Sequence, residues 1–224
     1  MIAPVENRAM SAPCHAALPA DLSGLQQGGL PLLIVISGPS GVGKDAVVQR
    51  MRESGYPFHF VITATTRKPR KDERHGINYF FLTEEQFIDL MHRDELLEHA
   101  LVYGEYKGIP KEQVRQALAS GQDVIMRLDV QGAATVKRLL PDAILVFLTA
   151  GSEEEWINRL RGRRTEDAAA LEKRLATVRE EMQRAAEFDY VVVNRDGELD
   201  QAVETIAAII RAEKCSTRQR AIRL

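Results

Sequence analysis

The sequence lacks the cysteines, the long apolar runs and the charge excess that mark several specialised classes of protein. Its 224 residues include two cysteines, Cys14 and Cys215, near opposite ends of the chain, and this spacing suits neither a disulfide framework nor a metal site. A reducing, cytoplasmic location is therefore expected. No run approaches the roughly 20 consecutive apolar residues that cross a bilayer, so a membrane is not an expected partner.

The chain also lacks an excess of charge of either sign. Its 30 Lys and Arg residues face 32 Asp and Glu residues, which gives a formal net charge of −2. Dedicated nucleic-acid-binding proteins usually carry a strong basic excess, so nucleic acid is not an expected partner. With 45% hydrophobic and 28% charged residues, the composition is typical of a globular protein, and the length suits one domain with a small insertion.

The two ends of the chain differ from its middle. Residues 1–30 are rich in Ala, Pro, Gly and Gln without a sustained apolar period, which predicts a flexible leader. The basic start and continuous apolar segment of a secretory signal are missing, and a weak organellar transit peptide is the alternative to a cytoplasmic location. Residues 214–224 form a basic tail, which is expected to be the solvated end of the last helix.

Apolar runs and helical periods alternate between these ends. Strand-like runs cover 31–37, 123–128, 144–149 and 190–193, and helical patterns follow at 45–54, 130–139, 153–161 and 198–213. This alternation predicts an α/β fold with a parallel sheet flanked by helices. Residues 58–109 break the rhythm with three strand patterns and one helix pattern. They are expected to form an inserted, mainly antiparallel subdomain within a core of 31–57 and 110–213.

The strongest chemical signal follows the first predicted strand. Residues 38–44 fit the pattern G-x-x-x-x-G-K between a buried strand and a helix, as a phosphate-binding loop requires. The glycines let backbone N–H groups converge on phosphate oxygens, and the helix start adds the positive end of its dipole. A glycine-rich turn without a ligand is the alternative. The expected binding residues are Gly38, Pro39, Ser40, Gly41, Val42, Gly43 and Lys44.

The residue after this loop departs from the usual motif. Asp45 stands where Ser or Thr normally offers a hydroxyl to Mg²⁺. A carboxylate is also a good ligand for a hard cation, so Asp45 is a candidate metal ligand. It also places a negative charge beside the phosphates, which a metal or a nearby cation has to offset.

A basic segment forms the next candidate site. Arg67 and Arg70 lie close together, Thr63 precedes them and Tyr79 follows. Guanidinium groups bind phosphate through paired hydrogen bonds, and a phenol adds a neutral donor. Composition alone favours a simpler interpretation, in which the segment is a solvated basic loop and Tyr79 is a core aromatic residue.

Four blocks in this order resemble the guanylate kinase family. They are GPSGVGK at 38–44, TTRKPR at 65–70 with GINYFF at 76–81, LDVQG at 128–132 and RLRGRR at 159–164. The resemblance covers about 32–213, and GKDAV, ALVYGEYKGIPK and FDYVVVN are similar to its plastid and mitochondrial branch. It implies a P-loop NTPase-type fold with an inserted GMP-binding subdomain and a helical lid at about 162–171. The implied activity is transfer of the γ-phosphate of ATP to GMP with Mg²⁺.

The resemblance also implies roles for individual residues. Arg67, Arg70 and Tyr79 would hold the phosphate of GMP, while Glu98 would accept hydrogen bonds from guanine with the help of Thr63. A base without the matching donors would leave Glu98 unpaired, which gives selectivity. The implied residues near the transferring phosphates are Lys44, Arg67, Arg159, Arg163 and Arg174. Asp129 would lie near GMP and the water shell of the metal, and Asn194 would approach the adenine.

Three further positions depart from the common family pattern. Lys107 replaces a phosphate-binding tyrosine, and Ile109 replaces a Ser or Thr that bonds the base. The loss of one hydrogen bond predicts guanine selectivity that is relaxed by about 1 kcal/mol. Arg127 replaces an Asp two residues before Asp129. We expect Arg127 to offset the charge of Asp45, and two unrelated substitutions are the alternative.

The sequence thus predicts a guanylate kinase. One alternative is a kinase of another purine monophosphate, and the other is a non-catalytic guanylate-kinase-like domain that binds proteins. Such interaction domains typically lack a working phosphate loop, so Gly41, Gly43 and Lys44 favour the enzyme.

Overall fold

The computed structural model describes residues 30–71, 73–102, 104–161 and 177–224. The predicted leader apart from Leu30, the predicted lid and the candidate residues Arg163 and Arg174 lie outside these ranges. Within them, no helix is long and apolar enough to cross a membrane.

The larger layer is a parallel sheet. Its described strands follow the order β2 (Phe58–Phe60), β7 (Asp123–Arg127), β1 (Leu33–Ser37), β8 (Ile144–Ala150) and β9 (Tyr190–Asn194). The predicted α/β architecture is confirmed. All five residues of β1 are buried, as expected for a central strand that is covered on both faces.

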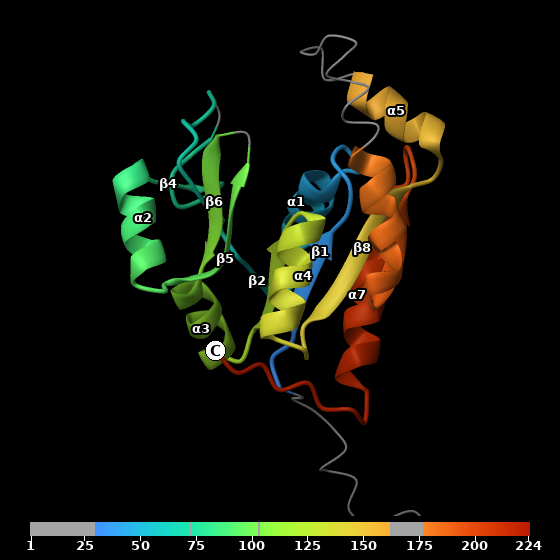
Figure 1. The fold of residues 1–224 in the computed structure, drawn as a ribbon. Helices are drawn as coiled ribbons and strands as arrows, with labels where there is room; N and C mark the ends of the chain where they lie inside the picture. The colour runs from blue at the N-terminus through green and yellow to red at the C-terminus, as the bar shows by residue number, and fades with distance from the viewer. Residues whose placement is uncertain (1–29, 72, 103, 162–176) are drawn as a thin grey trace, which may run out of the picture.

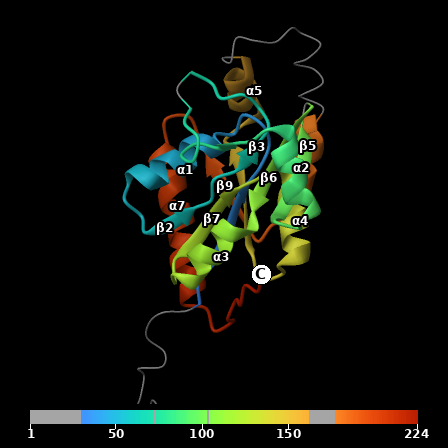
Figure 2. The same ribbon diagram turned by 90° about the vertical axis from the view of Figure 1, so that its left-hand side faces the viewer.

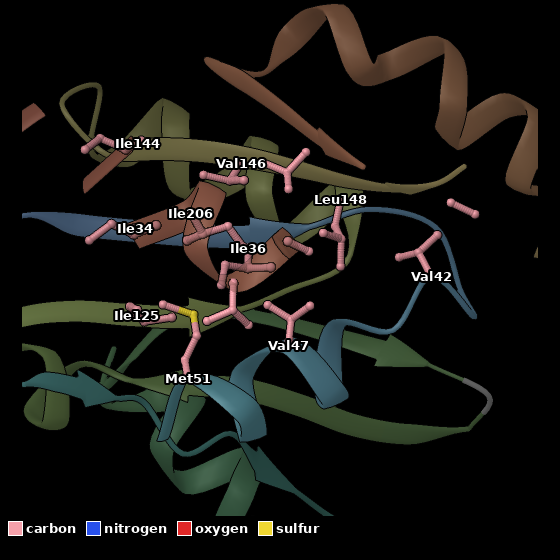
Figure 3. Close-up of a cluster of buried hydrophobic side chains, with 14 of the residues drawn as sticks. Ile34, Ile36, Val42, Val47, Met51, Ile125, Ile144, Val146, Leu148 and Ile206 are labelled. Atoms are coloured by element: carbon pink, nitrogen blue, oxygen red, sulfur yellow. The ribbon is translucent and has the colours of Figure 1, made fainter. Parts of the chain in front are cut away.

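Helices cover both faces of this sheet (Figures 1 and 2). They are α1 (Lys44–Glu53) and α7 (Leu199–Lys214) on one face, and α3 (Lys111–Ala119) and α4 (Val130–Leu139) on the other. Alternate residues of β1 enter the two cores: Ile34 and Ile36 face α1 and α7, whereas Leu33 and Val35 face α3 and α4. Figure 3 shows the first core, in which Ile34 pairs with Ile125 of the neighbouring strand.

The insertion forms a second, smaller sheet beside the first (Figure 1). Its order is β4 (Phe80–Phe81), β3 (Ala64–Thr65), β6 (Glu105–Pro110) and β5 (Leu96–Val102). Helix α2 (Glu84–His92) begins at a capping box that Thr83 and Gln86 form, and it buries Phe87 against this sheet. Strand β6 pairs antiparallel with both β3 and β5, and it ends at Pro110, directly before α3 of the core.

The expected start of the insertion is wrong. Residues 58–60 belong to the parallel sheet, because β2 pairs with β7, so the insertion begins later than residue 58. Its sheet is mainly antiparallel, as expected: β6 pairs antiparallel with β3 and β5, while the short pair of β3 and β4 is parallel. The segment 58–66 therefore contains two strands, β2 and β3, which belong to different sheets.

The end of the chain is also more ordered than expected. After α7, the tail crosses below the parallel sheet towards α3 (Figures 1 and 2). Arg220 is buried and contacts Glu213 through two hydrogen bonds of 2.8 Å, while Ile222 packs on the core. The expectation of a solvated tail is wrong at these positions because the tail has an acidic partner and an apolar surface to cover.

Candidate active site

The phosphate-binding loop joins β1 to α1 in a conformation that needs glycine. Gly38 and Gly43 have φ values of 139° and 92°, and side chains rarely adopt such positive values. A Cβ at Gly43 would lie 2.5 Å from the amide nitrogen of Asn194. The Lys44 ammonium curls back over the loop and donates to the carbonyls of Gly38 and Pro39, the latter at 2.9 Å. Burial lowers the pKa of Lys44 to about 8.

Side chains from elements later in the sequence hold the phosphate-binding loop in place. Trp156, on helix α5 (Glu153–Arg161), donates its indole N–H to the Ser40 carbonyl at 2.7 Å. The Asn194 amide donates to the Val42 carbonyl at 2.9 Å. Arg159 bonds the Asn194 carbonyl at 2.8 Å. Trp156 is buried, as its apolar pattern indicates, but its bond to the loop could not be read from the sequence.

The basic segment of the insertion is organised by an acidic residue. Both terminal oxygens of Glu73 accept from the Arg67 guanidinium at 2.8 Å, and the backbone N–H of Arg70 bonds the same carboxylate. The Arg67 side chain is 16% exposed and lies 5.2 Å from the centre of the Tyr79 ring. Glu73 therefore fixes the position of Arg67, whereas residues 68–71 are exposed, as the interpretation from composition expected.

Two carboxylates meet at the other wall of the site. Glu98, on β5, is 7% exposed, and Asp129 caps α4 by accepting from Gly132 N–H at 2.7 Å. A Cβ at Gly132 would lie 3.1 Å from a Glu98 carboxyl oxygen, so a glycine lets the helix start approach Glu98. Burial, followed by the charge of Asp129, raises the pKa of Glu98 to about 7.

A cavity of about 290 Å³ brings nine of the predicted residues together. The predicted residues in its lining are Gly38, Ser40, Lys44, Asp45, Thr63, Tyr79, Glu98, Lys107 and Asp129. Burial, and then the charge of Arg67, lowers the pKa of Lys107. A second cavity of about 220 Å³ adjoins the first, and Arg70 lines it. Ile109 pairs with Glu98 but lies fully buried in the core.

Two charged residues in the lining were not predicted to bind a substrate. Arg127 forms an ion pair with Asp45, which confirms the expected contact between these two substitutions. It also donates to the Tyr79 hydroxyl at 2.9 Å. Glu181 lies near Lys44, and burial raises its pKa while the charge of Lys44 opposes that shift. The sequence contains a signal for Arg127 alone, because this residue departs from the family pattern. It contains no signal for Glu181.

The carboxylates in this cavity fit a hard divalent cation that binds chiefly through a nucleotide. Asp45 and Asp129 line the cavity that Lys44 enters, and Mg²⁺ usually binds one or two carboxylates together with phosphate oxygens and water. In the described part of the chain, no group of three or more His, Cys, Asp or Glu side chains could hold a metal by itself.

Comparisons with known proteins agree with this geometry. Residues 31–213 match the protein family described as guanylate kinase. The chain is 51% identical to guanylate kinase 2, chloroplastic/mitochondrial, of Oryza sativa subsp. japonica over 87% of this chain and 68% of that protein. It is 45% identical to the guanylate kinase of Caldanaerobacter subterraneus subsp. tengcongensis over 82% and 88% of the two chains.

A solved structure shows the same similarity. The crystal structure of guanylate kinase from Anaplasma phagocytophilum superimposes with a TM-score of 0.71 at 25% identity, and covers 88% of this chain and 93% of that one. The phosphate loop, the facing carboxylates and the arginines of the insertion thus occur in a chain that matches the family over residues 31–213: it belongs to the guanylate kinase family.

Proposed function

We propose that this protein transfers the γ-phosphate of ATP to GMP and forms ADP and GDP, with Mg²⁺. The observation that carries the proposal is the shared cavity. Lys44 and the phosphate loop form one wall, while Tyr79, Lys107 and Glu98 line the rest. A site of this kind can hold two anionic nucleotides with their phosphates facing each other.

On the donor side, the phosphate loop and Lys44 bind the phosphates of ATP. The loop supplies converging N–H groups, and α1 starts directly behind it. Arg159 and Asn194 support the loop through the bonds described above, which is consistent with the roles that the resemblance implies for them near ATP. Asp45 and Asp129 would hold Mg²⁺ directly or through water, and the bound metal would neutralise charge on the phosphates.

On the acceptor side, cations bind the phosphate of GMP and carboxylates bind its base. Arg67, Arg70, Tyr79 and Lys107 supply donors for the phosphate. Glu98 accepts from guanine, and Thr63 and Asp129 line the same cavity. Adenine does not present the donor pair that Glu98 needs, so AMP would leave a buried acceptor unpaired.

The chemistry needs positioning and charge stabilisation rather than a proton-abstracting base. The acceptor phosphate is already an anion, so the residues need only hold both nucleotides in line and stabilise the moving phosphoryl group. Lys44, Arg67 and Arg159 are proposed for this role. Arg163 and Arg174 are proposed from the family resemblance and lie outside the described residues.

Measuring ADP formation with GMP, IMP and AMP as acceptors tests this proposal. We expect GMP to be the best acceptor, and Lys44→Ala to reduce kcat roughly 100-fold or more. Lys111→Ala, which removes a lysine paired with Asp94 away from the cavity, is the control and should stay active. A preference for AMP would support the other kinase alternative, and no turnover with any acceptor would support the interaction domain.

The cytoplasmic location stays a prediction. The rice relative is named chloroplastic/mitochondrial, so import through residues 1–30 is the competing proposal. Microscopy of a reporter fused to the C-terminal end of residues 1–30 distinguishes a cytoplasmic location from import, because only import concentrates the reporter in an organelle.

A further inference from the structure

Arg127 occupies the boundary between the donor and acceptor sides. It ends β7, and its side chain is 25% exposed. Among the described residues, Arg127, Asp45 and Tyr79 are the three that line both adjoining cavities. These three side chains are also bonded to one another through the guanidinium of Arg127.

The contact with Tyr79 prepares a phosphate-binding group. The Tyr79 hydroxyl accepts from Arg127 at 2.9 Å, so its own proton remains available for a phosphate oxygen. A hydroxyl that accepts from a cation becomes a better donor. The guanidinium groups of Arg67 and Arg127 lie 5.2 and 5.6 Å from the centre of the same ring. Two arginines therefore contact the same phenol.

The contact with Asp45 is easier to break than a buried ion pair. The Asp45 side chain is 73% exposed, and exposed ion pairs are weak. Asp45 directly follows Lys44, at the motif position whose side chain faces the Mg²⁺ of a bound nucleotide. Its carboxylate has a hard cation as a competing partner there. Movement of Asp45 towards that cation would free one edge of the Arg127 guanidinium.

We propose that Arg127 is a further phosphate-binding residue of the acceptor site, and that Asp45 holds its guanidinium until a metal–nucleotide complex occupies the phosphate loop. Once released, Arg127 binds the acceptor phosphate next to Tyr79. Donor binding then strengthens acceptor binding, and the reverse holds by thermodynamic linkage. This inference rests on the proposed function, because it assumes that the acceptor is a nucleoside monophosphate.

Calorimetric titration of the full chain with GMP tests the inference without relying on turnover. We expect ADP with Mg²⁺ to raise the GMP affinity of the native protein by roughly 5-fold or more, which is an ordinary size for coupling between sites. ADP with EDTA should have a smaller effect, because no cation then competes for Asp45.

Substitutions at both ends of the ion pair separate this role from a structural one. In the presence of Mg·ADP, Arg127→Ala should weaken GMP binding about 10-fold, as expected when a charge-assisted contact is lost, and the variant should no longer respond to Mg·ADP. Asp45→Asn should bind GMP tightly without Mg·ADP, because Arg127 is then already free. Arg127→Lys keeps the charge and provides a second variant if Arg127→Ala does not fold. It should bind GMP with intermediate affinity.

An exposed arginine outside the cavity provides the control. Arg115→Ala removes exposed ion pairs with Glu95 and Glu112 and should keep both the GMP affinity and its response to Mg·ADP. If Arg127→Ala keeps them too while the native protein binds GMP, the inference is wrong and the proposed function stands. If the native protein does not bind GMP at all, the proposed function fails and the inference fails with it.

Discussion

At the scale of single residues, Glu98 is both a buried carboxylate and the proposed hydrogen-bond acceptor for guanine. Burial and the nearby Asp129 raise its pKa to about 7, so its charged form is disfavoured in the folded protein. Its contribution to folding stability is therefore fully present below the unfolded pKa of about 4.5 and is lost as pH rises through 7. The affinity for GMP should depend on pH in the opposite direction and rise with pH, because the N–H donors of guanine bond the charged carboxylate better than the protonated acid.

We expect GMP affinity to fall about tenfold between pH 8 and pH 6 as Glu98 takes up a proton. The phosphate of GMP also titrates near pH 6, so Glu98→Gln is the necessary control. This variant should bind GMP weakly and show only the phosphate's share of the pH dependence. Titrations of both proteins at several pH values measure the difference, and parallel profiles would contradict the assignment.

Ile109 allows a residue-scale test of selectivity. It pairs with Glu98 and is fully buried, so it cannot supply the hydrogen bond that the family position usually provides. Ile109→Thr should restore a hydroxyl beside the base and raise the ratio of GMP to AMP turnover about fivefold, which corresponds to about 1 kcal/mol. Ile109→Val controls for the change in volume. Equal ratios for Thr and Val would count against the expectation.

At the scale of elements, helix α5 supports the phosphate loop through Trp156. Its indole N–H bonds the Ser40 carbonyl at 2.7 Å. Trp156→Phe keeps the aromatic packing and removes this bond, which costs about 1 kcal/mol. We expect a KM for ATP that is raised about fivefold with little change in the KM for GMP. Steady-state kinetics with each substrate varied in turn measures this, and an equal rise in both KM values would argue against a local effect.

How much the sequence could predict also depends on the element. The alternation of strands and helices is local, so most of the parallel sheet and its helices could be predicted. Helix α3 and strand β6 could not, because their patterns are weak and β6 is defined by pairing with β3 and β5. The phosphate loop could be found from its spacing, whereas the contacts of Arg127 depend on distant segments of the chain.

At the scale of the whole molecule, the C-terminal tail stabilises the fold through buried contacts of Arg220. Arg220 and Glu213 have side chains that are each 7% exposed, and Arg220 also reaches the Asp142 carbonyl. Removal of one partner leaves a buried charge unpaired, so Arg220→Ala should lower the free energy of unfolding by about 3 kcal/mol. The kcat of the variant should not change below its unfolding temperature.

Chemical denaturation and an activity assay together check this prediction. Arg218→Ala is the matched control, because Arg218 is 69% exposed and contacts Asp142 at 3.7 Å. It should change the free energy of unfolding by less than about 1 kcal/mol. A loss of kcat in Arg220→Ala at low temperature would show that the tail affects the active site as well as the fold.

Because Trp156 bonds the phosphate loop, its intrinsic fluorescence should report binding at that loop. The sequence contains one tryptophan, so its ultraviolet emission arises from a single indole that is 2.7 Å from the Ser40 carbonyl. Indole emission depends on local polarity and hydrogen bonding, and nucleotide phosphates would bind the same loop. Changes in intensity or wavelength should therefore report donor binding in the unlabelled protein, on the timescale of rapid mixing.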